Sequence, residues 1–342
     1  MARSFGLLRA GFPYLKTIGR AGVTHPPADL NFGKDGRIYV ICHTYTYTIR
    51  TINLDDEDLG TFGTMAVKFP TVEDGEFMTP VQLIVDQDER LYVSDEACHR
   101  ISIMSHEGEF LGKWGEHGSG DGQLDRPSGI AFDADGNILV VDTQNHRVQK
   151  FTKDGRYLAK WGHQGNEDGE LNLPWGIDVD DEGCVYVGDW RNDRVQKFTA
   201  DGEFVFKFGT SGAGKGQFNR PAGVVVDRDG DIYVADRGNN RIQLFDPDGT
   251  YEQQFLGDAT LSKEMVRRIM TTSKRQNRIR LMSNREDEKF FKRPRSVRVD
   301  DEGHMFVPDY EDFRVQVYKK EAYPLSEEEV DPPMKSELIS TN

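Results

Sequence analysis

Residues 126–162 read RPSGIAFDADGNILVVDTQNHRVQKFTKDGRYLAKWG, and this stretch returns twice with few changes. It recurs as LPWGIDVDDEGCVYVGDWRNDRVQKFTADGEFVFKFG in residues 173–209 and as RPAGVVVDRDGDIYVADRGNNRIQLFDPDG in residues 220–249. The leading prolines Pro127, Pro174 and Pro221 are 47 residues apart, and Pro80 lies 47 residues before the first of them. Weaker copies begin at Pro27 and Pro294. The chain therefore contains six copies of one unit.

Each copy predicts four short antiparallel strands. In the first copy, GIAFD, NILVVD, RVQKF and YLAKWG are separated by aspartate–glycine turns and one polar loop. One such sheet cannot bury both of its faces alone, whereas sheets arranged radially bury them against each other. We therefore expect an all-β fold, a six-bladed β-propeller with four-stranded antiparallel blades, as a single domain over residues 1–320.

The two ends of the chain predict how the ring closes. The sixth copy, PRSVRVDDEGHMFVPDYEDFRVQVYKK, supplies only three strands. Residues 14–19, YLKTIG, match the fourth strands of other copies, such as FLGKWG, so we expect an N-terminal strand to close the last blade. Residues 321–342 follow the last copy, are acidic and contain proline, and we expect them to form a disordered tail.

The repeated signature, P-x-G-[IV]-x-[VF]-D followed by N-x-R-[VI]-Q-x-F, resembles the NHL repeat. The resemblance implies a binding propeller, and some members of that family bind single-stranded RNA on a basic face. A more distant similarity is to the lyase propeller that completes peptide amidation, which holds a channel zinc with histidines that commonly follow the leading proline. In this sequence none of those positions is a histidine; they are Ala28, Val81, Ser128, Trp175, Ala222 and Arg295.

An aspartate that ends the second strand of a copy is followed five residues later by an arginine. Because each acid has its own arginine, we expect these pairs to fix loops between blades rather than to bind a metal. The pairs are Asp95/Arg100, Asp142/Arg147, Asp189/Arg194, Asp236/Arg241 and Asp309/Arg314.

Composition excludes several classes of protein. The net charge is −15, from 43 basic and 58 acidic residues, which disfavours non-specific attraction to nucleic acid or anionic lipid. No run of apolar residues is long enough to span a membrane, and the N-terminus lacks the pattern of a signal peptide. The three cysteines have no metal-binding spacing. We expect a cytoplasmic protein with reduced thiols and no membrane partner.

Positions where a copy departs from its own consensus are candidates for function. The glycine two residues after the leading proline is replaced by Asp29, Gln82 and Ser296 in blades 1, 2 and 6, which are neighbours in a ring. This divergence fits either relaxation of the repeat at ring closure or a binding site. We expect the residues after the leading prolines, together with those after the second-strand aspartates, to face one mouth of the central channel. The second set is His43, Glu96, Thr143, Trp190, Arg237 and Tyr310.

An insertion separates the last two copies, since Pro294 follows Pro221 by 73 residues instead of 47. Residues 263–298 hold 13 basic and 4 acidic side chains, a local excess of positive charge. The insertion, about 258–290, lacks strand periodicity and is rich in helix formers, so we expect a helical segment. It is a candidate for a solvated surface, a lid, a docking patch for an acidic partner or, less favoured, an RNA-binding patch.

The sequence predicts a propeller that binds a protein or an anionic or aromatic small molecule at the channel mouth near blades 6, 1 and 2. The alternative is a lyase or hydrolase at the same mouth, with His43 or Tyr45 as acid or base. Cofactors stay open: zinc or calcium is compatible with the channel, with Asp29 and Gln82 as oxygen ligands, but no motif requires either. The ligand-binding candidates are Arg237, Arg295, Trp175, Trp190, Tyr310, Glu96, Gln82 and Asp29.

Overall fold

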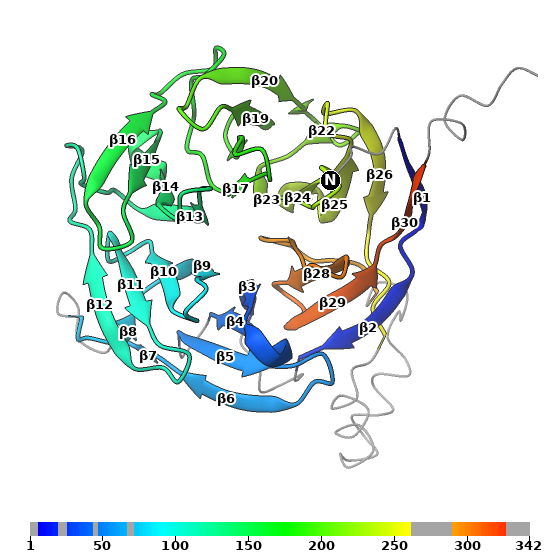
Figure 1. Cartoon of the computed structure of the whole chain (residues 1–342). Coiled ribbons are helices and arrows are strands. Elements are labelled where there is room, and N and C mark those ends of the chain that lie inside the picture. Colours follow the sequence, from blue (N-terminus) through cyan, green and yellow to red (C-terminus); the bar gives the residue numbers. More distant parts are fainter. Residues whose placement is uncertain (1–5, 20–25, 44–46, 67–71, 261–288, 326–342) are drawn as a thin grey trace, which may run out of the picture.

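The structure, a computed structural model, describes residues 6–19, 26–43, 47–66, 72–260 and 289–325. Six four-stranded antiparallel sheets surround a central axis, which confirms the predicted propeller (Figure 1). Blade 1 contains β3 (Pro27–Phe32), β4 (Ile38–Cys42), β5 (Thr48–Ile52) and β6 (Asp58–Phe62), and blade 2 contains β9 (Pro80–Val85), β10 (Leu91–Asp95), β11 (Arg100–Met104) and β12 (Phe110–Trp114). Blade 3 contains β13 (Pro127–Phe132), β14 (Ile138–Asp142), β15 (Arg147–Phe151) and β16 (Tyr157–Trp161), and blade 4 contains β17 (Ile177–Val179), β18 (Val185–Asp189), β19 (Arg194–Phe198) and β20 (Phe204–Phe208).

Blade 5 consists of β23 (Pro221–Val226), β24 (Ile232–Asp236), β25 (Arg241–Phe245) and β26 (Tyr251–Phe255). Blade 6 takes β27 (Arg298–Val299), β28 (His304–Asp309) and β29 (Arg314–Lys319) from the end of the chain and β2 (Tyr14–Ile18) from its beginning. The pairing of β2 with β29 is antiparallel, with Ile18 opposite Val315. The predicted closure of the ring by an N-terminal strand is therefore confirmed (Figure 1).

The hydrophobic core is divided into six clusters, one between each pair of neighbouring blades. All five residues of β4, β10, β14, β18 and β24 are buried, because the second strand of each blade has another blade on both faces. The cluster between blades 6 and 1 includes Ile18, Leu30 and Val317, each with no exposed surface. Closure therefore buries apolar side chains from both ends of the chain in a single cluster.

The aspartate–arginine pairs fix the loops that connect successive blades. Asp142 accepts a bond from Arg147 Nε at 2.8 Å, and the other nitrogens of Arg147 donate to carbonyls of the loop entering blade 3. Equivalent 2.7–2.8 Å contacts join Asp189/Arg194, Asp236/Arg241 and Asp309/Arg314. Blade 2 differs: Asp95 accepts the backbone N–H groups of Met78 and Thr79, and Arg100 donates to the Glu76 carbonyl. The predicted structural role is thus observed in four blades as a direct pair.

Two short parallel pairs lie in loops between blades, β7 (Thr64–Met65) with β8 (Glu76–Phe77) and β21 (Thr210–Ser211) with β22 (Gln217–Phe218). The helices are single 3₁₀ turns, η1 (Lys34–Gly36), η2 (Thr143–Asn145) and η3 (Arg237–Asn239). The described residues contain no α-helix, so the expected helical insertion has no support; most of it, residues 261–288, lies outside the described part of the chain. Nothing in the described ranges forms a helix long and apolar enough to cross a membrane.

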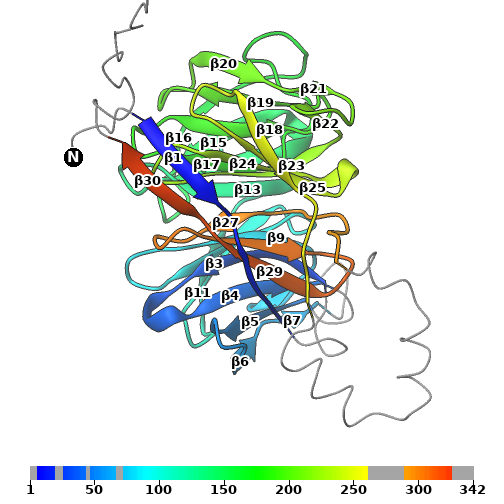
Figure 2. The same ribbon diagram turned by 90° about the vertical axis from the view of Figure 1, so that its right-hand side faces the viewer.

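The first five residues of the expected disordered tail form a strand. Residues 321–325 form β30 (Glu321–Leu325), which pairs with β1 (Gly6–Gly11) in an antiparallel ribbon beside the propeller (Figure 2). The reason is that β29 and β2 bring both ends of the chain to the same blade, where backbone pairing satisfies their hydrogen-bonding groups. The rest of the predicted tail, residues 326–342, lies outside the described residues.

Candidate functional site

The two sets of residues predicted to face one mouth of the channel do lie together. In blade 3 the hydroxyl groups of Ser128 and Thr143 are 2.7 Å apart, and in blade 6 the Arg295 guanidinium lies over the Tyr310 ring, 3.7 Å from its centre. In each case one residue follows a leading proline and the other follows a second-strand aspartate. The two sets lie side by side at the same end of these blades, because the β-strand pairing places the start of the first strand beside the end of the second.

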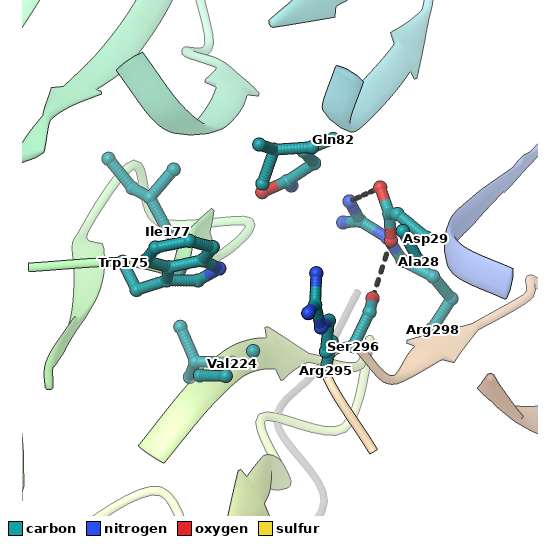
Figure 3. Close-up of a pocket in the computed structure, with 13 residues that line it drawn as sticks. Ala28, Asp29, Gln82, Trp175, Ile177, Val224, Arg295, Ser296 and Arg298 are labelled. Carbon is teal, nitrogen blue, oxygen red and sulfur yellow. Dashed lines mark hydrogen bonds and ion pairs between the residues drawn. The ribbon is translucent and has the colours of Figure 1, made fainter. Parts of the chain in front are cut away.

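Below this mouth the channel is narrow. Where a glycine follows the leading proline by two residues, the first strands of neighbouring blades touch through their backbones; a Cβ at Gly176 would lie 2.2 Å from the Ala222 carbonyl oxygen. The remaining cavity, shown in Figure 3, has a volume of about 20 Å³. That volume holds about one water molecule. A ligand at this site would therefore bind on the mouth and not inside the channel.

The divergent residues of blades 6, 1 and 2 form a buried polar seam. Asp29 is 1% exposed, pairs with Arg298 at 2.9 Å and accepts a hydrogen bond from Ser296 (Figure 3). Its second oxygen accepts the backbone N–H of Leu83 at 3.1 Å. Gln82 lines the same cavity and donates to the Ile130 carbonyl at 3.0 Å. These bonds join blades 6, 1, 2 and 3 in the part of the ring where the glycine contacts are missing, and they give Asp29 and Gln82 structural partners within the protein.

A pocket at the mouth lies over blades 4, 5 and 6, whereas the expected position was over blades 6, 1 and 2, so the two share only blade 6. Its cavity volume is about 50 Å³, and its lining is Trp175, Trp190, Ala222, Arg237 and Arg295. Among the residues that the structure describes, no hydrogen-bond partner meets the buried Nε atom of either arginine. Burial lowers the pKa of both arginines, and the charge of Arg295 lowers the pKa of Arg237 further. The pocket thus holds two guanidinium groups close together, and the Nε donor of each makes no hydrogen bond to a described residue.

Further arginines surround the pocket. The guanidinium carbons of Arg191 and Arg220 each lie 5.1 Å from the centre of the Trp190 ring, a cation–π distance. Arg220 also adds its charge to those that lower the pKa of Arg237. Sequence reasoning missed Arg220 and Arg126, although an arginine directly before the leading proline, as in Arg126, Arg220 and Arg293, was a visible signal.

His43 lies beside this pocket but is buried, with 4% of its surface exposed. Burial lowers its pKa to about 4, so the imidazole is neutral near pH 7. Nε2 donates to the Pro80 carbonyl, which leaves Nδ1 to accept the Tyr310 hydroxyl at 3.4 Å. Both nitrogens of His43 are therefore engaged, and its ring positions Tyr310, which in turn lies under Arg295. Tyr45, the other acid or base that we predicted, lies outside the described residues.

Glu96 provides negative charge on the opposite part of the mouth. Its carboxylate lies 3.5 Å from Arg126 Nε, and burial raises its pKa while Arg126 and Arg295 lower it. The structure thus brings Trp175, Trp190, Arg237, Arg295, Tyr310, His43 and Glu96 to one mouth, whereas Asp29 and Gln82 lie deeper, in the channel wall.

A sequence profile described as the NHL repeat matches residues 124–151, 171–198 and 218–245. These ranges cover the first three strands of blades 3, 4 and 5. The resemblance seen in the sequence is therefore confirmed for the three blades with the most regular copies. No curated protein sequence matches the chain.

Solved structures with a similar fold share little sequence with this chain. A catalytically inactive virginiamycin B lyase from Staphylococcus aureus with quinupristin is 13% identical, with a TM-score of 0.56, over 92% of this chain and 89% of that chain. The WD40 β-propeller domain of Doa1 is 11% identical, with a TM-score of 0.58, over 92% and 98%. A protein of unknown function from Bacteroides thetaiotaomicron is 17% identical, with a TM-score of 0.62, over 92% and 77%. At these identities the similarity shows the fold alone.

Proposed function

We propose that this chain, a six-bladed propeller with NHL repeats, is a binding module that captures an acidic protein segment at the channel mouth over blades 4, 5 and 6. The observation that carries the proposal is the pair Arg237 and Arg295, whose buried Nε donors have no partner among the described residues. Leaving a buried charged donor unbonded costs more than leaving a neutral one unbonded, so an incoming carboxylate would relieve that cost.

The size of the pocket favours one acidic group presented by a larger partner. A cavity of about 50 Å³ is far smaller than the roughly 300–1,000 Å³ that encloses a drug-sized ligand. A carboxylate fits between the guanidinium groups while the rest of the partner lies across the mouth. Trp175 and Trp190 supply the aromatic surface that commonly anchors protein partners.

Local charge supports the same class of partner. The chain carries a net charge of −15, yet the mouth over blades 4, 5 and 6 holds five arginines, Arg191, Arg220, Arg237, Arg293 and Arg295. A positive patch on an acidic protein attracts acidic segments and repels basic ones, which gives specificity as well as faster association.

A propeller lyase at the same mouth is the second candidate, and its support is the similarity in fold to virginiamycin B lyase. His43 is less suited to acid or base chemistry on a bound ligand, because it is buried and both of its nitrogens are bonded. RNA binding by the basic insertion is the third candidate, but residues 261–288 lie outside the described part. Protein binding therefore comes first.

The test uses a short peptide of glutamates around one phenylalanine, with its lysine counterpart as the opposite probe, and follows the tryptophan fluorescence of the protein. We expect saturable binding of the acidic peptide only. Arg237→Ala and Arg295→Ala should each weaken it by about 10- to 100-fold, which is the loss of one charge-assisted hydrogen bond of about 1.5–3 kcal/mol.

The matched control is Arg156→Ala, an exposed arginine in a turn of blade 3, which should leave the affinity unchanged. Equal binding of the acidic and basic peptides, or equal loss in the control and in the two mouth variants, would show that the mouth does not recognise acidic groups.

A further inference from the structure

We propose a Zn²⁺ site formed by His99, on the loop between β10 and β11 of blade 2, together with His117 and Asp125, on the loop from blade 2 to blade 3. His99 Nδ1 lies 3.4 Å and His117 Nε2 lies 3.7 Å from Asp125 Oδ1, and one ligand atom from each residue lies within 4.8 Å of the others. This is the single group of three or more such side chains with metal-ligand spacing within the described ranges. The site is separate from the pocket proposed to bind acidic segments.

The spacing suits a tetrahedral ion. Bonds of about 2.0–2.1 Å to nitrogen and oxygen place neighbouring ligands roughly 3.4 Å apart, close to the two distances observed. The donor set, two imidazoles and one carboxylate, leaves a fourth position open. His117 is largely exposed and can rotate to complete the geometry, whereas His99 and Asp125 are partly buried and less free to move.

The backbone holds the three residues in place before any ion arrives. The Leu124 N–H donates to the Glu116 carbonyl at 2.8 Å, and the Asp125 N–H donates to the buried Asp142 carboxylate at 2.6 Å. His99 occupies the left-handed region, with φ of 53°, and its Nδ1 accepts the Arg126 N–H at 3.1 Å. A zinc ion bound at Nδ1 would replace that hydrogen bond. Nδ1 must be unprotonated to accept the N–H, and an unprotonated ring nitrogen is also the form that binds a metal.

The repeat shows that the fold does not require these ligands. At the next blade junction, 47 residues further along the chain, the first position is again a histidine and the other two positions differ, and at the junction 94 residues further along all three positions differ. His146 and Asp193 replace His99, and each accepts a backbone N–H of the next blade, as His99 does. The ligand positions 117 and 125 become Gln164 and Asn172 at one junction, and Ser211 and Asn219 at the other. Only the first junction therefore combines three metal-binding side chains.

The repeat also supplies substitutions that preserve the fold. His117→Gln and Asp125→Asn install the residues that the next junction already uses, so both variants should fold like the wild type. The control is His163→Gln, which removes an exposed histidine that pairs with Glu170 at 3.1 Å on the following loop. Untagged full-length protein is stripped with a chelator and titrated with Zn²⁺ by calorimetry at neutral pH.

We expect one Zn²⁺ per wild-type chain with micromolar affinity, and the same for His163→Gln. His117→Gln and Asp125→Asn should each lose at least about tenfold in affinity, since each removes one of three ligands. Zinc should also raise the melting temperature of the wild type and not of Asp125→Asn, because the ion ties two loops together only in the folded state. Absence of saturable binding to the wild type, or unchanged affinity in both ligand variants, would overturn the proposal.

Discussion

Replacing Lys320 by methionine should destabilise the propeller strongly, because this lysine neutralises three aspartates. Its Nζ lies 2.6 Å from Asp227, 2.7 Å from Asp229 and 2.9 Å from Asp231, and its side chain is 4% exposed. Lys320 follows β29 in blade 6, whereas the aspartates occupy the turn between β23 and β24 in blade 5. The cluster therefore links two blades next to the ring closure.

The size of the effect follows from burial. Asp227 and Asp231 are 7% and 1% exposed, so methionine would leave two buried carboxylates without their cation, and breaking a buried pair in this way costs about 3–5 kcal/mol. With an unfolding entropy of about 2.1 cal/mol/K per residue over roughly 320 residues, that loss lowers the melting temperature by about 5–7 °C. Lys160→Met is the control, since Lys160 and Asp121 form an exposed pair, which solvent screens and which contributes little to stability.

The pH dependence provides a second readout. Burial raises the pKa of Asp227 even beside Lys320, and removing the ammonium group would raise it further. A carboxylate with a raised folded-state pKa costs stability as pH rises above its unfolded value, and acidification relieves that cost. Thermal unfolding at pH 7.5 and pH 5 should therefore show a smaller deficit for Lys320→Met at pH 5. A loss no larger than that of Lys160→Met, or a deficit that grows on acidification, would refute the reasoning.

Two further predictions test the ring closure and the buried carboxyl group of Asp178. Ile18→Ala should cost about 2–5 kcal/mol in urea unfolding, because Ile18 is fully buried in the closing cluster, whereas Leu15→Ala on the same strand should cost little because Leu15 is 44% exposed. Equal losses would argue against β2 as a packed fourth strand. Burial raises the pKa of Asp178 to about 6, so the contribution of Asp178 to wild-type stability should fall as pH rises from 4 to 7, by at most about 3 kcal/mol. Asp178→Asn keeps an acceptor for the Val226 N–H, so it should remove that slope and be more stable than the wild type at pH 7.5; a melting curve series with an unchanged slope would contradict this.

The sequence was a good guide wherever the fold repeats. The 47-residue period, the four β-rich runs per copy and the missing fourth strand in the last copy each predicted a feature that the structure contains. The reason is that each blade contacts mainly its neighbours, so one set of local preferences is enforced six times. The same comparison between copies found Arg295, Arg237 and the two tryptophans, since they differ at positions where the fold tolerates change.

Prediction was weaker where residues from distant copies meet. Divergence at Asp29, Gln82 and Ser296 fitted either ring closure or a binding site. The structure gives Asp29 a buried ion pair with Arg298, 269 residues away, and a hydrogen bond from Ser296, and it gives Gln82 a bond to the Ile130 carbonyl. The sequence did not indicate His99, His117 and Asp125 as a group, because nothing in their spacing shows that two loops bring them together.

The sequence by itself determined the blades, their number and the way the ring closes, because these follow from a repeating pattern of strands and turns. Only the tertiary structure decided which part of the mouth holds a pocket. Closure of the ring brings Trp175 and Trp190 of blade 4 together with Arg237 of blade 5 and Arg295 of blade 6. Their shared pocket arises from the angle between blades, a property of the closed ring and not of any single copy.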